Sequence, residues 1–470
     1  MKFLQKNVGI LIMMVVLVVA LSSTGCIGGT NSGDFVVENG VLTRYAGAEP
    51  VEAGDSPPDH IETGIVVNIP DNLGITAIGG MAFSHRPGIS AMNIPKGVVS
   101  IGEGAFENCT GLTSVTIPDT LESIGDAAFG GCSSLSSITI PEGVTSIGDG
   151  AFSNCSSLTS VSIPDSVTTI GGFAFSDCSS LASATMGSGV TSIGNRAFAG
   201  TKLSSPVIIN DGKTLCYVPP GMTSYTIPNT VKTINGYAFS NCSSLTSLNV
   251  PDSVTTIGDY AFEGCSQLKS VAIPDSITQI GRAAFNRTGI SAPVIIDQGK
   301  LLCYVPVSYT AYTIPDTVTE INAGAFGNCS QLKTITLPES VNKIGDGAFF
   351  NCTGLTSIKF SAAITTIGKD AFGNCKKLIA VELPQAITSI NEVLFGNCES
   401  LRSITIPNGV TSIGVSAFFN CTGLTSITIP ASVTFIGKTA FDGCENLTII
   451  CPKDSYAQQY AIENAIQYTR

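Results

Sequence analysis

Cysteine is the residue type in this sequence that is best suited to chemistry. The chain has 16 cysteines and two histidines, and a metal site needs such residues to converge, commonly through C-x-x-C spacing. No C-x-x-C occurs. Instead, twelve cysteines each lie three residues after a phenylalanine, namely Cys109, Cys132, Cys155, Cys178, Cys242, Cys265, Cys329, Cys352, Cys375, Cys398, Cys421 and Cys444. This spacing predicts a ladder of buried free thiols. Disulfides between rungs and a metal site are the alternatives, and parallel Cβ vectors disfavour the disulfide dihedral angle.

Other motifs that could carry chemistry are incomplete. The Gly-Asp-Gly at 148–150 resembles the start of a dinucleotide-binding loop, but Ser153 stands where its third glycine is needed. The Gly-Lys-Thr at 212–214 resembles the end of a P-loop, but Val207 replaces the earlier glycine. His60 and His85 have no recognisable catalytic partner. We therefore expect no enzymatic activity and no metal or other cofactor.

Asn-Cys-Ser/Thr occurs six times, and each copy is formally an N-glycosylation sequon. The six asparagines are Asn108, Asn154, Asn241, Asn328, Asn351 and Asn420. The same Asn-Cys pair also occurs at Asn374 and Asn397 without the hydroxyl residue. The sequons are therefore explained by a repeat in which the asparagine is expected to bond the backbone at a turn, and glycosylation is the alternative.

The charge composition of the chain argues against one class of binding partner. Charged residues make up 12% of the chain and hydrophobic residues 43%, and the formal net charge is −12. An acidic chain is poorly suited to phosphate backbones, so nucleic acid is not expected as a partner.

Residues 1–25 are predicted to be a signal peptide. Lys2 and Lys6 precede an apolar run of 13 residues at 9–21, and Ser23-Thr24-Gly25-Cys26 follows. These residues resemble the lipobox of prokaryotic lipoproteins, although Ser23 stands where leucine is usual. The resemblance implies that Cys26 becomes the lipidated N-terminus, which anchors the protein outside the cytoplasm, at the outer face of the membrane or on the cell surface. An ordinary cleaved signal with secretion, or a retained anchor, are the alternatives, and 13 residues are short for a span of about 20. Residues 26–34 are expected to form a flexible tether.

The cysteines and asparagines belong to a sequence repeat that begins at residue 75 and must position them. Phenylalanine marks the repeat at steps of 23 residues, except for steps of 41 from Phe198 to Phe239 and from Phe285 to Phe326. One copy, at 158–178, has apolar residues with L-x-x-L-x-L spacing, and Pro164 then ends the strand. A single copy cannot bury its apolar residues alone, whereas stacking does so at about 1.5–3 kcal/mol for each side chain.

Two further features of the copy predict its turns. The repeat position of Gly171 is occupied by glycine in twelve copies and by asparagine in three, which are Asn235, Asn322 and Asn391. This choice predicts a left-handed backbone conformation. Ala174 and Phe175 are expected on a short helical or 3₁₀ turn, with the phenylalanines in a stacked spine and the strands in one long parallel sheet on the inner face.

The predicted domain organisation follows from these patterns. A hairpin unit and loop at 35–74 is followed by a solenoid at 75–452, with β-hairpins inserted near 203–222 and 290–309 because 206–219 and 293–306 are near copies of each other. Residues 453–470 are expected to form a C-terminal cap, with a helix over 454–465.

The exposed strand positions of the inner face are the candidate binding residues. Hydroxyl side chains dominate this row in the early copies, and charges enter later. The candidates are Thr246, Asn249, Lys269, Lys333, Lys359, Glu382, Arg402 and Thr405. The alternative is that small residues merely fill an unused face.

The pattern LxxIxIPxxVxxIGxxAFxxCxxL resembles the BspA-type leucine-rich repeats, over about residues 35–452. The fold class expected is therefore an α/β-type repeat solenoid, with parallel strands on the concave face, short helical or 3₁₀ turns on the convex side, two inserted β-hairpins and a capping helix. The resemblance implies a surface protein that binds proteins or cells, and it identifies no ligand. We expect the protein to be a monomer. Glycan or polymer binding is the alternative function. An ice- or mineral-binding hydroxyl array would need a flat face.

Mass spectrometry of the mature N-terminus tests the anchor. We expect a lipid-modified Cys26 as the first residue. An unmodified N-terminus, or a chain that retains residues 1–25, would contradict this expectation.

Overall fold

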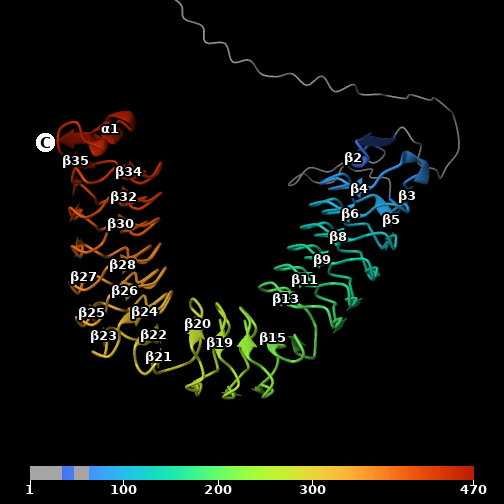
Figure 1. The fold of residues 1–470 in the computed structure, drawn as a ribbon, viewed down its shortest axis with the longest axis horizontal. Coiled ribbons are helices and arrows are strands. Elements are labelled where there is room, and N and C mark those ends of the chain that lie inside the picture. The colour runs from blue at the N-terminus through green and yellow to red at the C-terminus, as the bar shows by residue number, and fades with distance from the viewer. Residues whose placement is uncertain (1–33, 47–62) are drawn as a thin grey trace, which may run out of the picture. The chain divides into compact units, whose positions relative to one another are not determined.

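The computed structural model describes residues 34–46 and 63–470, which wind into stacked coils of about 23 residues (Figure 1). The predicted signal peptide, Cys26 and nearly all of the tether lie outside the described residues. The chain divides into two compact units, Met1–Gly187 and Ser188–Arg470. Both units are built from coils whose strands pair in parallel with those of neighbouring coils.

The predicted L-x-x-L-x-L strands form one row in each unit, which we call the first ladder. The row falls into separate short sheets, and within each sheet neighbouring strands pair in register, as Ser160 with Ser183 and Val161 with Ala184. Val161 is buried between exposed Ser160 and Ser162, as strand alternation requires. The strands of the first unit are β3 (Ile65–Asn68), β5 (Ile89–Asn93), β7 (Ser114–Thr116), β10 (Ser160–Ser162) and β12 (Ser183–Thr185). Those of the second unit are β16 (Ser224–Thr226), β18 (Ser247–Asn249), β23 (Ala311–Thr313), β25 (Thr334–Thr336), β27 (Ser357–Lys359), β29 (Ala380–Glu382), β31 (Ser403–Thr405), β33 (Ser426–Thr428) and β35 (Thr448–Ile450).

Each coil also contributes to a second ladder, which the expectation of a single sheet missed. Its strands have only two residues, so no alternation could reveal them in the sequence. In the first unit they are β4 (Ala77–Ile78), β6 (Ser100–Ile101), β8 (Ser123–Ile124), β9 (Ser146–Ile147) and β11 (Thr169–Ile170). In the second unit they are β13 (Ser192–Ile193), β17 (Thr233–Ile234), β19 (Thr256–Ile257), β20 (Gln279–Ile280), β24 (Glu320–Ile321), β26 (Lys343–Ile344), β28 (Thr366–Ile367), β30 (Ser389–Ile390), β32 (Ser412–Ile413) and β34 (Phe435–Ile436).

The expected helical turns and the α/β description do not fit the described residues. The helices among them are α1 (Tyr456–Glu463) and a three-residue 3₁₀ helix, η2 (Asp71–Leu73). At the Ala-Phe position the chain makes turns. The Ala151 N–H bonds the Gly148 carbonyl of its own coil at 3.3 Å, but the Phe152 N–H donates to the Ala174 carbonyl of the next coil at 2.8 Å. Bonds that run between coils are not available to build a helix along the chain.

The prediction of a left-handed conformation at Gly171 is wrong, since the positive φ lies two residues later, at Phe173 (φ 55°). Glycine is needed at 171 for space. A Cβ there would lie 2.4 Å from the Asp149 nitrogen and 2.5 Å from the Gly148 carbonyl carbon of the preceding coil.

The three asparagines that replace this glycine lie where the second ladder is interrupted. In the second unit the ladder falls into separate sheets, which begin again at the two hairpins and at β30. At each break an asparagine Nδ2 donates to an isoleucine carbonyl of the strand before it. The bonds run from Asn235 to Ile193 (2.7 Å), from Asn322 to Ile280 (2.7 Å) and from Asn391 to Ile367 (2.6 Å). The side chain therefore provides a hydrogen bond where strand pairing is interrupted.

Antiparallel hairpins lie in the segments where the sequence predicts them. They are β1 (Phe35–Glu38) with β2 (Val41–Tyr45), β14 (Val207–Ile209) with β15 (Thr214–Tyr217), and β21 (Val294–Ile296) with β22 (Leu301–Tyr304). The second strand of each hairpin pairs in parallel with the next strand of the second ladder, which is β4, β17 or β24. Each hairpin thus contributes its second strand to the second ladder.

The marker phenylalanines form a buried, stacked spine. Phe106 and Phe129 are 0% exposed, and their ring centroids lie 5.0 Å apart at an interplanar angle of 9°. The Phe106 N–H donates to the Ala128 carbonyl of the next coil at 2.7 Å, and Ala128 is fully buried. This close backbone contact explains why alanine precedes the phenylalanine.

The C-terminal segment covers the last coil with α1 and a further strand, β36 (Gln467–Thr469), which the sequence did not suggest. Ser455 caps α1 by accepting a bond from the Gln458 N–H, and the Tyr460 ring packs edge-on against Phe441 at 6.0 Å. β36 pairs in parallel with β35.

Replacing Gly258 by alanine tests the close approach between coils. Its Cβ would lie 2.4 Å from the Gly236 nitrogen, whereas Gly221 of the same unit has no atom within 4 Å of that position. We expect Gly258→Ala to destabilise the second unit by about 1–3 kcal/mol and to lower its urea midpoint. The control Gly221→Ala should leave the midpoint within error, and equal midpoints for the two variants would contradict the packing argument.

Candidate ligand-binding face

The predicted cysteine ladder joins consecutive coils by thiol hydrogen bonds. The Cys132 Sγ donates to the Phe106 carbonyl of the preceding coil at 3.2 Å, and Cys155 bonds Phe129 in the same way. After each hairpin the acceptor changes, so that Cys242 reaches the Val218 carbonyl at 3.6 Å. All cysteines of the described residues are free and buried. The sulfur atoms therefore act as small apolar groups with one weak donor.

Burial also makes these thiols unreactive. It raises the pKa of Cys109, Cys216 and Cys303 to about 12, because a thiolate is poorly solvated inside the stack. Cys444 is an exception, since a hydrogen bond from Cys421 lowers its pKa. Within 34–46 and 63–470 no three His, Cys, Asp or Glu side chains are grouped to hold a metal ion.

The asparagines of the Asn-Cys pairs do not bond the backbone through their side chains as predicted. The amides bond each other across coils, since Asn351 donates to Asn328 at 2.9 Å and Asn420 donates to Asn397 at 3.0 Å. Their backbone is left-handed, with φ of 65° at Asn328 and 61° at Asn351, which asparagine tolerates. The left-handed position predicted for the repeat therefore lies here and at Phe173, not at the glycine.

All eight candidate residues are exposed on the first-ladder side of the second unit. Asn249, Lys359, Glu382 and Thr405 each end a strand, which is β18, β27, β29 or β31. Thr246, Lys333 and Arg402 each lie immediately before a strand, β18, β25 or β31. Lys269 belongs to a coil whose Ala272 forms a single bridge with Asn249.

The structure brings three of the eight together in one open groove. The groove has a volume of about 870 Å³ and is lined by residues 358–362, 380–385 and 403–405. Lys359, Glu382 and Thr405 lie on it, whereas Thr246, Asn249, Lys269, Lys333 and Arg402 do not. Sequence reasoning missed Phe360 and Leu383, which supply apolar surface to the groove.

The groove lies where one coil departs from the repeat. Phe360-Ser361 replaces the usual Ile-Pro, and the Phe360 ring packs edge-on against Phe372 at 5.6 Å. Ser361 is 2% exposed, and its Oγ donates to the Glu339 carboxylate at 3.2 Å. The replacement of Ile-Pro by Phe360-Ser361 is visible in the sequence, and it could have indicated the position of the groove.

The two charged residues of the groove, Lys359 and Glu382, are not paired with each other and can interact with a ligand. Lys359 and Glu382 are register partners in β27 and β29, yet in the described part of the chain neither forms an ion pair. Glu320 and Lys343, register partners in the second ladder, do pair, at 3.1 Å. The groove therefore presents one cation and one anion beside an aromatic ring.

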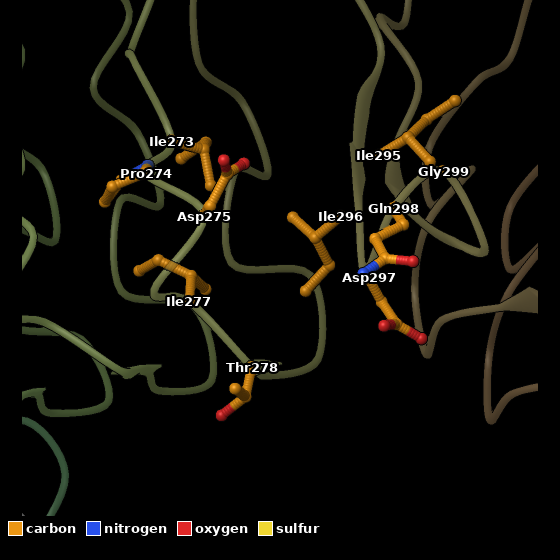
Figure 2. A pocket seen from close by; sticks show the side chains of 10 residues that line it. All are labelled: Ile273, Pro274, Asp275, Ile277, Thr278, Ile295, Ile296, Asp297, Gln298 and Gly299. Atoms are coloured by element: carbon orange, nitrogen blue, oxygen red, sulfur yellow. The ribbon is translucent and has the colours of Figure 1, made fainter.

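Two smaller openings lie elsewhere in the second unit. One of about 390 Å³ is lined by 273–278 and 295–299 (Figure 2). The other, of about 420 Å³, is lined by β19, β20, Leu301 and Asn322. Like the groove, both adjoin an interruption of a ladder.

The comparison with family models identifies one family. The model described as BspA type Leucine rich repeat region matches residues 100–218, 212–297, 302–424 and 390–467. A leucine-rich repeat protein from Bacteroides ovatus is 29% identical, with 86% of this chain and 91% of that chain covered and a TM-score of 0.36. A leucine rich cell surface protein from Faecalibacterium prausnitzii is 28% identical, with 94% and 98% covered and a TM-score of 0.36. No curated protein matches the sequence. In the part of the chain that the structure covers, no helix has the length and hydrophobicity to cross a bilayer.

Thiol labelling tests the chemistry of the ladder. At about pH 8 a thiol-reactive dye should label the native protein far more slowly than the guanidinium-unfolded protein, because thiols with raised pKa react only after local opening. Cys444 should react first, and Cys444→Ser should remove this fast phase. Rapid labelling of many thiols in the native protein would contradict buried, unreactive cysteines. A count of labelled thiols in the unfolded protein below the number of cysteines would contradict free thiols.

Proposed function

Since the chain belongs to the BspA-type leucine-rich repeat family, we propose that it is a cell-surface protein that binds a partner protein through the groove around Phe360. Proteins of this family interact with other proteins at the cell surface, and the similar Faecalibacterium protein is described as a cell surface protein. On this proposal, Cys26 carries the lipid anchor and the mature chain adheres to other cells or to a surrounding matrix.

The composition of the groove supports a protein ligand. Phe360 is partly exposed, and Lys359 and Glu382 lie exposed on the same groove. An aromatic residue beside polar and charged groups is typical of protein interfaces. The volume of about 870 Å³ is large enough for several side chains of a partner.

The hydroxyl side chains of the first ladder favour this function over glycan or ice binding. The Thr246 Oγ1 donates to the Thr223 carbonyl at 3.1 Å, and Thr425 bonds Arg402 in the same way. Such bonds hold the hydroxyl hydrogens between coils. Fewer donors then remain for a sugar or an ordered layer of water.

Charge reversal at Lys359 is the direct test of the groove. We expect Lys359→Glu and Phe360→Ala each to reduce binding of the labelled mature protein to intact bacterial and epithelial cells at least about tenfold, because hot-spot truncations cost this much. Flow cytometry measures the binding, and trypsin treatment of the cells should abolish it.

The matched control is Lys333→Glu, which makes the same charge change on an exposed first-ladder residue outside the groove. It should bind like the unaltered protein, and circular dichroism verifies the fold of each variant. An equal loss in the control would contradict the groove, and binding that survives trypsin but not glycosidase would favour a glycan.

A further inference from the structure

The hairpin β21–β22 leaves an opening of about 390 Å³ beside the coil that precedes it (Figure 2). One wall is the proline turn at 273–278, and the other is the hairpin turn at 295–299. Ile277 and Ile296 are buried, while Ile273 and Ile295 are partly exposed. Asp275 and Asp297 stand exposed on opposite walls.

The opening exists because one proline turn is missing from a stack. In several regular coils a hydroxyl joins the proline turn to the coil before it, as the Ser276 Oγ joins the Val254 carbonyl at 2.8 Å. The coil after 273–278 carries the hairpin in place of such a turn. The next proline turn bonds the hairpin instead, through the Thr317 Oγ1 and the Gly299 carbonyl at 3.0 Å. The apolar side of the turn at 273–278 is therefore left uncovered.

The hairpin β14–β15 closes the corresponding position with a hydrogen bond that the hairpin β21–β22 lacks. There the Asn210 Nδ2 donates to the Thr191 carbonyl at 3.0 Å. Asp297 occupies the place of Asn210, and Thr278 the place of Thr191. An ionised carboxylate accepts hydrogen bonds and donates none, so Asp297 cannot make this bond.

The Gln298 side-chain amide also lines the opening, but within the described residues the acceptor groups of Asp275, Asp297 and Thr278 have no donor paired with them. Among the residues that the structure describes, no hydrogen bond reaches the Thr278 carbonyl, and neither Asp275 nor Asp297 forms an ion pair. Two carboxylates and a carbonyl thus surround isoleucine side chains. An occupant must bring positive charge, N–H donors and an aliphatic stem.

We propose that this opening binds a lysine or arginine side chain of a partner protein. The methylene groups of such a side chain pack on Ile273, Ile277 and Ile295, as long basic side chains do on apolar surfaces. Its head bonds Asp275, Asp297 and the Thr278 carbonyl, and charge-assisted bonds of this kind are the stronger ones. The inference rests on the proposed protein-binding function and adds the chemistry of a second contact, away from the groove.

Titration of the mature protein with a pentapeptide that has a central lysine between two valines tests this proposal. The affinity is measured by saturation-transfer NMR at low ionic strength. The same peptide with norleucine keeps the aliphatic stem and removes the charge, and we expect it to bind at least about tenfold more weakly. The double variant Asp275→Asn/Asp297→Asn should lose the lysine peptide by a similar factor. Asparagine at 297 reproduces Asn210 of the hairpin β14–β15, so this change is compatible with the fold.

The matched control is Asp252→Asn/Asp316→Asn, which changes the net charge equally at the same position of two other proline turns that do not line the opening. It should bind the lysine peptide like the unaltered protein. If both double variants lost affinity for the lysine peptide equally, the net negative charge of the protein would explain the binding and the proposed site would be wrong. The site would also be wrong if the norleucine peptide bound as tightly as the lysine peptide. If the lysine peptide fails to bind while the protein still binds cells through the Phe360 groove, the inference is wrong and the proposed function stands.

Discussion

Backbone contact between neighbouring coils at the marker phenylalanine is the interaction on which the rest of the structure depends. The Phe106 N–H donates to the Ala128 carbonyl of the next coil, and the Phe106 carbonyl accepts the Cys132 thiol of that same coil. The coils must approach closely for both bonds to form, which favours alanine and glycine at neighbouring positions. Each coil buries its apolar residues only against its neighbours, so an exact repeat of these contacts stabilises the whole stack.

The same constraint explains why the openings lie where they do. A regular coil packs against the coil before it, and several of its side-chain donors bond carbonyls of that coil. Where a hairpin replaces a proline turn, or where Phe360-Ser361 replaces Ile-Pro, the cover is incomplete and space remains. The three openings described in the second unit all adjoin such interruptions. Regular coils thus provide the scaffold, and departures from the repeat provide the surfaces that can bind.

The period of 23 residues and the buried roles of phenylalanine, alanine and cysteine could be predicted because each coil repeats the same contacts. The second ladder could not, since two-residue strands carry no periodic pattern. Gly171 was misinterpreted because glycine serves two needs, a left-handed backbone and a close approach, and only the position of Asp149 distinguishes them. The exposed row of candidate residues was predictable from alternation. Which of them share a groove depends on Phe360 and on strand register, so Lys359 and Glu382 meet there while Lys333 and Arg402 lie outside.

Hydrogen–deuterium exchange of the native protein tests the central claim that coil-on-coil register orders the chain and that its interruptions are local openings. The account predicts that the backbone amides of Phe349 and Phe372, which bond the next coil in regular turns, exchange at least about tenfold more slowly than amides of the turn at 273–278 beside the hairpin β21–β22. Equal protection of these segments, or faster exchange at Phe349 and Phe372, would contradict it.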